Sequence, residues 1–114
     1  MATFFLVHGA WQGVWAWQTI VDRLGSAGHV AIAVDLPGDG SDATPAGDVT
    51  TMLYAERVAA LIDAMPEDEK VIVVGHSMGG TVAAQVSELR PARIAVAVYL
   101  CAFLIRDGES IVDF

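Results

Sequence analysis

The sequence of 114 residues has a single cysteine, Cys101, and only six basic residues against fourteen acidic ones. One cysteine excludes an internal disulfide framework and is typical of a reducing compartment, so we expect a cytoplasmic protein. The net charge of −8 disfavours nucleic acid and anionic membranes as partners. No cluster of His, Cys or carboxylate residues has metal-ligand spacing, and we expect neither a metal nor another cofactor.

Long apolar runs are also few. No basic segment precedes the apolar start at residues 2–7, which disfavours a secretory signal. The longest run, residues 94–105, is too short to span a bilayer, so no membrane is expected as a partner. The chain is nevertheless apolar, with 54% hydrophobic residues and a mean hydropathy of +0.52. This content predicts strands buried on both faces, or a surface that packs against more protein.

Strand and helix patterns alternate along a chain long enough for one domain. Runs of β-branched and apolar residues predict strands at 3–7, 30–34, 71–74 and 94–100, and the last of these, apolar throughout, is expected to be buried. Helical periodicity predicts helices from about 14 to a stop at 27–28, over 51–65, and over 82–89. The alternation predicts an α/β fold: a parallel sheet of about four strands with helices on both faces.

The segment Gly75-His76-Ser77-Met78-Gly79 lies where the third strand turns into a helix. So tight a corner strains the backbone of its central residue and leaves little room for flanking side chains, which explains Gly75 and Gly79. This is the pattern of a nucleophile elbow, and it predicts Ser77 as the nucleophile. A phosphate-binding loop would need Gly-Lys-Ser/Thr, and no lysine follows Gly75.

The exit of the first strand, His8-Gly9-Ala10-Trp11, is expected to lie beside the elbow. In parallel sheets, function gathers at the carboxyl ends of the strands. The backbone amides of Ala10 and Met78 would then form an oxyanion hole around a reacting carbonyl. Trp11 is a candidate wall of the substrate pocket.

Three motifs in order resemble the α/β-hydrolase fold, and more narrowly its small esterase branch, which contains plant methylesterases, related hydroxynitrile lyases and many bacterial esterases. The motifs are Val7-His8-Gly9-Ala10-Trp11, Asp35-Leu36-Pro37-Gly38 and Val74-Gly75-His76-Ser77-Met78-Gly79-Gly80. The resemblance covers almost the whole chain. It implies Ser77 as nucleophile, Ala10 and Met78 as oxyanion-hole residues, Gly9 and Trp11 beside the substrate, and a small-molecule ester as that substrate. It also implies a threonine at the position of Gly9 in the lyases, so glycine favours an esterase.

The base that Ser77 needs is missing, because catalytic residues in this fold run Ser, Asp or Glu, then His, and no histidine follows His76. The acidic residues Asp107, Glu109 and Asp113 lie in what resembles the run into the family's lid. We therefore expect residues 1–114 to form a partial α/β-hydrolase domain, the N-terminal half, without the lid or the part that carries the catalytic Asp and His. Two alternatives stay open: a non-catalytic ligand-binding module and a hydroxynitrile lyase-type enzyme. A last strand without a further partner would also favour self-association through the sheet edge.

The remaining candidate residues are expected to have structural roles. We expect His8 to hydrogen-bond backbone, His76 to point away from Ser77, His29 to be solvated, Trp15 and Trp17 to lie in the core or cap a helix, Cys101 to be a small buried residue, Asp35 to cap the following loop and Asp39 to be a turn residue.

Overall fold

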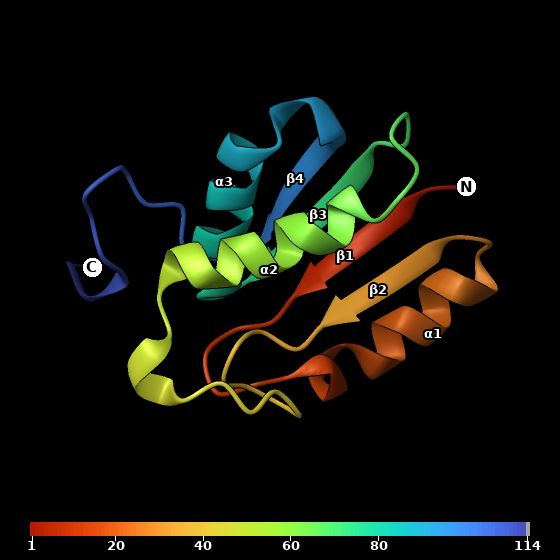
Figure 1. Cartoon of the computed structure of the whole chain (residues 1–114). Coiled ribbons are helices and arrows are strands. Elements are labelled where there is room, and N and C mark those ends of the chain that lie inside the picture. The colour runs from red at the N-terminus through yellow and green to blue at the C-terminus, as the bar shows by residue number, and fades with distance from the viewer. Residues whose placement is uncertain (114) are drawn as a thin grey trace.

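Four parallel strands form one sheet in the computed structural model, which describes residues 1–113 (Figure 1). The strands are β1 (Thr3–Val7), β2 (Val30–Val34), β3 (Val71–His76) and β4 (Ile94–Leu100). Their spatial order is β2-β1-β3-β4. At the centre of the sheet, Phe5 of β1 lies opposite Ile32 of β2 and Val73 of β3. The predicted strands are confirmed, with β3 two residues longer at its carboxyl end.

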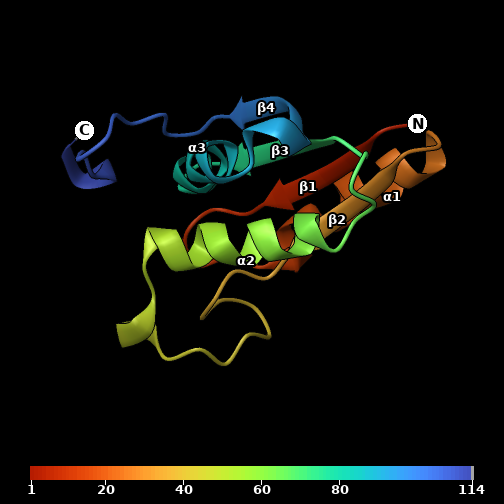
Figure 2. The ribbon, with the colours of Figure 1, turned by 45° about the horizontal axis from the view of Figure 1, so that its top comes forward.

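Helices cover both faces of the sheet, as predicted. Helix α1 (Gln18–Ser26) lies on one face, and α2 (Thr51–Asp63) and α3 (Gly79–Leu89) lie side by side on the other (Figure 2). Short 3₁₀ segments occupy Val14–Trp17, Ala46–Asp48, Pro91–Arg93 and Ile111–Asp113. No helix within residues 1–113 is long and apolar enough to cross a membrane.

Three helix boundaries differ from the predicted ones. Helix α3 starts at Gly79, three residues before the predicted start at 82. The helix expected from about residue 14 begins with the 3₁₀ segment, and α1 itself starts at Gln18. Helix α2 ends at Asp63, two residues before the predicted end. Its start agrees with the prediction, because Thr50 Oγ1 caps the helix by accepting a hydrogen bond from the amide of Leu53 at 3.0 Å.

The two sides of the sheet bury separate hydrophobic clusters, because successive side chains of a strand point to opposite faces. The larger cluster lies under α2 and α3 and includes Phe5, Val7, Val73 and Val82. The smaller lies under α1 and consists of Leu6, Trp17 and Val74 with partly buried neighbours.

The two tryptophans of the 3₁₀ segment have different environments. Trp17 is buried in the smaller cluster, as expected. The core prediction for Trp15 is wrong, since its side chain is 65% exposed. A 3₁₀ segment has three residues per turn, so two residues two positions apart cannot face the same side.

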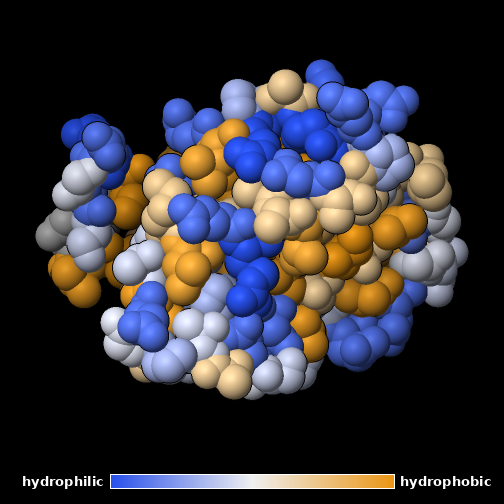
Figure 3. Space-filling view, in the orientation of Figure 1, coloured by the Kyte–Doolittle hydropathy of each residue, from blue (hydrophilic) through white to orange (hydrophobic). Residues whose placement is uncertain are grey.

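The prediction that the fourth strand is buried is also wrong. Val96 and Leu100 are 50% and 47% exposed. Within the described residues β4 pairs only with β3, so its other edge is open. The segment after β4 begins in contact with the elbow, because the amide of Phe103 donates to the carbonyl oxygen of Ser77 at 3.1 Å. Its later part extends away from the body of the molecule, with hydrophobic surface visible beside it (Figure 3). An apolar sequence indicates a strand suited to burial, but its neighbours decide how far it is buried.

Candidate active site

Ser77 occupies the corner between β3 and α3 in a left-handed backbone conformation, with φ of 54°. The two glycines around it allow a close approach of strand and helix. A Cβ on Gly75 would overlap the carbonyl oxygen of Gly79, and one on Gly79 would lie 2.5 Å from the carbonyl oxygen of Val7. The corner is therefore as tight as the sequence predicted, and the strain falls on Ser77.

The loop that leaves β1 packs directly against this corner. A Cβ on Gly9 would lie 3.1 Å from Ser77 Cβ and 3.3 Å from the carbonyl oxygen of His76. The structure thus brings together Gly9 and Ser77, which are 68 positions apart in the sequence. Ala10 and Met78 follow them directly in the two loops.

His8 fixes the backbone of that loop. Its side chain is fully buried, and its Nε2 accepts a hydrogen bond from the amide of Leu36 at 3.1 Å. Nδ1 must then carry the proton, and it donates to the carbonyl oxygen of Gly9 at 2.7 Å. Both ring nitrogens are occupied by backbone groups, so the expected structural role of His8 is confirmed.

Gln12 holds the same peptide segment from the other side, and sequence reasoning missed it. Its Oε1 accepts a hydrogen bond from the amide of Gly9 at 2.8 Å. The amide of Gln12 also donates to the carbonyl oxygen of Gly9 at 3.4 Å. An amide side chain three residues after a glycine in a loop is the only signal that the sequence offers for this contact.

Asp35 joins the loop after β1 to the loop after β2. Its Oδ1 accepts from the amide of Val14 at 2.8 Å, and its Oδ2 accepts from the amide and hydroxyl of Ser41 at 3.2 and 2.8 Å. Burial alone would raise the pKa of Asp35, but the hydrogen bonds from Val14 and Ser41 outweigh it and hold the pKa below its ordinary value. The predicted capping role is confirmed, and it extends to both loops that border the site.

The other two histidines lie away from the serine hydroxyl. His76 Nδ1 contacts the carbonyl oxygen of Leu100 at 3.0 Å, and its ring meets Trp17 edge-on at 6.4 Å between centroids, which fits the expected structural role. His29 is half-buried rather than solvated, since its Nδ1 accepts a hydrogen bond from the amide of Ala2 at 2.9 Å.

Cys101 contradicts its prediction, because it is exposed and has φ of 45°. The chain turns sharply where β4 ends, and this turn directs the thiol away from the core. Among residues 1–113 there is no group of three or more His, Cys, Asp or Glu side chains that could hold a metal ion.

A cleft of about 550 Å³ opens beside the residues that follow Gly9 and Ser77. It is lined by Ala10, Trp11, Pro37, Gly38, Asp39, Ala46, Val49, Thr50, Thr51, Tyr54 and Met78. Trp11 stands at its rim with 92% of its surface exposed and φ of 59°. Burial and then the nearby charge of Asp39, which also hydrogen-bonds the tyrosine, raise the pKa of Tyr54. Trp11 therefore lies at the edge of the cleft, and its contact with a substrate stays a prediction.

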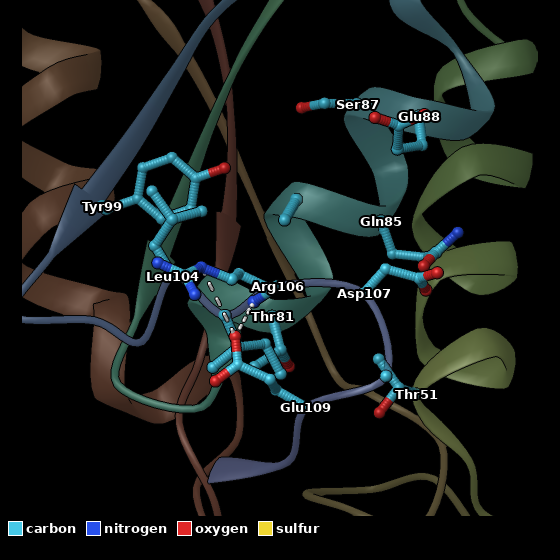
Figure 4. A pocket seen from close by; sticks show the side chains of 13 residues that line it. Thr51, Thr81, Gln85, Ser87, Glu88, Tyr99, Leu104, Arg106, Asp107 and Glu109 are labelled. Carbon is cyan, nitrogen blue, oxygen red and sulfur yellow. Dashed lines mark hydrogen bonds and ion pairs between the residues drawn. The ribbon is translucent and has the colours of Figure 1, made fainter. Parts of the chain in front are cut away.

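A larger hollow of about 840 Å³ shares Thr51 with this cleft and lies between α3, Tyr99 of β4 and the segment from Leu104 to Glu109 (Figure 4). Polar side chains surround it, and Arg106 donates its backbone amide to Glu109 Oε1 at 2.9 Å. None of its lining residues comes from the loop after β1. We therefore assign the candidate site to the smaller cleft, which is lined by residues of both loops that meet at Ser77.

A model of the alpha/beta hydrolase family matches residues 4–113. The chain belongs to this family. Methylesterase 1 of Arabidopsis thaliana is 43% identical over 103 residues, which cover 89% of this chain and 39% of that protein. An alpha-hydroxynitrile lyase of the same plant is 41% identical over 102 residues, covering 89% of this chain and 40% of that protein. The crystal structure of polyneuridine aldehyde esterase has a TM-score of 0.90 at 34% identity, covering 99% of this chain and 45% of that chain.

This alpha/beta hydrolase chain therefore spans less than half the length of these relatives. It corresponds to the N-terminal portion of the fold, as the sequence resemblance implied. Relatives named as esterases and as a lyase share this portion, so the fold and family are established for the chain while its reaction has to be argued from its own residues.

Proposed function

We propose that this chain supplies the nucleophile and the oxyanion-binding groups of a hydrolase that cleaves small carboxylic esters. The observation that carries the proposal is the left-handed backbone of Ser77 at the start of α3, with the loop of Gly9 packed against it. A corner of this kind directs the serine side chain to the carboxyl end of the sheet, where an ester carbonyl would reach it. The relatives named methylesterases support an ester as the substrate.

The hydrogen bonds of His8 support Ala10 as one oxyanion-hole donor. The carbonyl of Gly9 and the amide of Ala10 belong to one planar trans peptide, so they point in opposite directions. Because His8 Nδ1 holds that carbonyl at 2.7 Å, the amide of Ala10 is directed away from His8. Met78 is the N-cap residue of α3, where unpaired amides and the helix dipole favour negative charge. One such donor contributes roughly 10²–10³-fold to the rate.

The reaction would follow the usual course of acyl transfer. A base takes the proton of Ser77 Oγ, the oxygen attacks the ester carbonyl carbon, and the amides of Ala10 and Met78 bind the oxyanion. The alcohol leaves with that proton, and water then releases the acyl group from Ser77. Both nitrogens of His8 are occupied by backbone and Nδ1 of His76 contacts Leu100, so the base and its carboxylate partner are proposed to come from outside these 114 residues.

A hydroxynitrile lyase is the second candidate, since one such enzyme is 41% identical to this chain. The space around Gly9 favours the esterase. A Cβ there would lie 3.1 Å from Ser77 Cβ and 3.2 Å from Gln12 Oε1, which leaves little room for the threonine that the resemblance implies for lyases. A non-catalytic ligand-binding module would keep the cleft without using Ser77.

Covalent labelling tests the role of Ser77. We expect a fluorophosphonate to label Ser77 in a form of the protein that also carries a catalytic His and Asp, as located by peptide mapping. Label on another residue, or no label on such a form, would contradict the proposal. The 114-residue chain alone should hydrolyse p-nitrophenyl acetate no faster than its Ser77→Ala variant, because no base is available. A rate that depends on Ser77 and is typical of esterases would show that a group within the chain acts as base.

We also propose that the open edge of β4 supports association between copies of this chain. The edge carries unpaired backbone groups next to exposed Val96, Val98 and Leu100, and β4 contains no lysine, proline or charged residue.

A further inference from the structure

The cleft beside Ala10 and Met78 combines two aromatic side chains with a carboxylate. Trp11 stands at the rim, and Tyr54 and Asp39 line the wall. No Lys, Arg or His side chain is among its lining residues. Aromatic side chains and a carboxylate therefore border the cleft, and the Tyr54 hydroxyl hydrogen-bonds Asp39.

The charge of Asp39 is not neutralised by another side chain. Asp39 forms no ion pair with any residue that the structure describes. Asp42 in the same loop forms an ion pair with Arg57 instead, with Asp42 Oδ2 at 2.7 Å from Arg57 Nη1. Arg57 is further held by the carbonyl oxygen of Asp35 at 3.4 Å, so it is not available to Asp39.

We propose that this cleft binds a cationic nitrogen of the substrate, so that the preferred esters carry an ammonium group in their acyl or alcohol part. The statement that the bound cation is part of an ester substrate rests on the proposed function, whereas the statement that the cleft binds a cation does not. A cation placed over an indole or phenol ring is attracted by the negative face of the ring, and a carboxylate adds direct charge attraction. Trp11 and Tyr54 supply the rings and Asp39 the carboxylate.

The rest of the cleft and of the molecule favours the same class of ligand. Apolar wall residues such as Pro37 and Val49 suit the methyl or methylene groups around a substituted nitrogen. The net charge of −8 raises the local concentration of cations and repels anions. An anionic ester would have to place its charge beside Asp39.

Binding of choline to the 114-residue chain tests the proposal without any need for catalysis. Choline is titrated into ¹⁵N-labelled protein, and the shifts of the Trp11 indole and the Ala10 and Met78 amides are followed. The neutral probe is 3,3-dimethylbutan-1-ol, which has the same shape without the charge. Where light scattering shows association at the working concentration, the titration is run in a Val96→Lys background, because β4 lies at the opposite edge of the sheet from β2 (Figure 1) and contributes no residue to the lining of the cleft.

Two matched pairs of variants separate the site from general effects. Asp39→Asn should weaken choline binding about fivefold, while Asp48→Asn, which removes the same charge from an exposed position of the same loop outside the cleft lining, should change it little. Trp11→Leu should weaken binding similarly, and Trp15→Leu, at another exposed tryptophan, should not. The neutral alcohol should bind at least about fivefold more weakly than choline.

Three results would overturn the inference: equal binding of choline and the neutral alcohol, equal effects of the two aspartate variants, or no shift at Trp11 at choline concentrations up to the molar range. These outcomes are independent of the proposed reaction. A form labelled at Ser77 that does not bind choline would keep the hydrolase and reject the cation site. Choline binding by a protein in which Ser77 is never labelled would keep the cation site and reject the hydrolase.

Discussion

Gly75→Ala is the substitution whose cost follows most directly from the geometry of the elbow. Gly75 lies in β3 between Val7 of β1 and Tyr99 of β4. An added Cβ would lie 2.6 Å from the carbonyl carbon of Gly79 and 2.8 Å from the amide nitrogen of Gly80, and closer still to the carbonyl oxygen of Gly79. These atoms form the backbone of the first turn of α3, so no flexible side chain can move aside.

The expected cost is large for a single methyl group. Adding a methyl group to a well-packed interior destabilises a protein by about 1–3 kcal/mol, and we expect about 3 kcal/mol here because the clash is with backbone. For a domain of this size, 1 kcal/mol shifts the melting temperature by roughly 4 °C, so Gly75→Ala should melt about 12 °C lower. Thermal and urea unfolding followed by circular dichroism measure the change.

Gly25→Ala is the matched control. Gly25 lies in α1, is not among the glycines with positive φ, and has no heavy atom within 4 Å of an added Cβ. Alanine has the higher helix propensity, so this variant should be more stable by about 0.5 kcal/mol. If Gly75→Ala melted within about 2 °C of the unchanged protein, the close approach of β3 and α3 would be refuted. If Gly75→Ala fails to fold while Gly25→Ala folds, the result agrees with the expected loss of stability.

Further predictions concern the sheet edge, acid stability and the thiol. Val96→Lys should reduce the light scattering of the purified chain, and a stable monomer of the unchanged chain at tens of micromolar would contradict association through β4. Hydrogen bonds from Thr44 and Gly38, with Arg57, hold the pKa of Asp42 far below 3.8, and the Arg90 hydrogen bond lowers the pKa of Asp63. Because both pKa values are lower in the folded chain than in the unfolded one, the ionised carboxylates stabilise the fold above about pH 4, and this contribution is lost as the pH falls. The urea midpoint of Asp42→Asn should therefore fall less between neutral and acidic pH than that of the unchanged chain. Cys101 is exposed, so a thiol reagent such as DTNB should react with it in native protein as fast as in urea, and a slow native reaction would contradict the position found here.

Several features could be predicted from the sequence because short-range sterics determine them. The strands are apolar runs bounded by loop residues, and their alternation with helical patterns leaves a parallel sheet as the simplest arrangement. The corner at Ser77 was predictable because only glycine at positions 75 and 79 lets strand and helix approach so closely. The left-handed φ of 54° at Ser77 is the observed form of the predicted strain.

Other features depend on contacts between distant segments, which composition does not encode. The exposure of Cys101 follows from the turn at the end of β4, and the exposure of Trp15 follows from the 3₁₀ start of the first helical segment. The link from Gln12 to Gly9 requires the side chain to fold back over its own loop. The role of His8 as a brace between Gly9 and Leu36 could be expected in kind, but its two partners could not be named from the sequence.

The apolar content of the chain is divided between two kinds of strand. Side chains of β1 and β3 such as Phe5 and Val73 are fully buried between the sheet and helices α2 and α3, so their hydrophobic surface is already covered within the chain. Val96, Val98 and Leu100 of β4 are each 38–50% exposed. Burying such a side chain completely contributes about 1.5–3 kcal/mol, so covering the remaining exposed part of all three would contribute roughly 3 kcal/mol. That gain is as large as the expected cost of Gly75→Ala, and pairing of the open backbone edge would add to it, so contact with further protein along β4 would stabilise this fold appreciably.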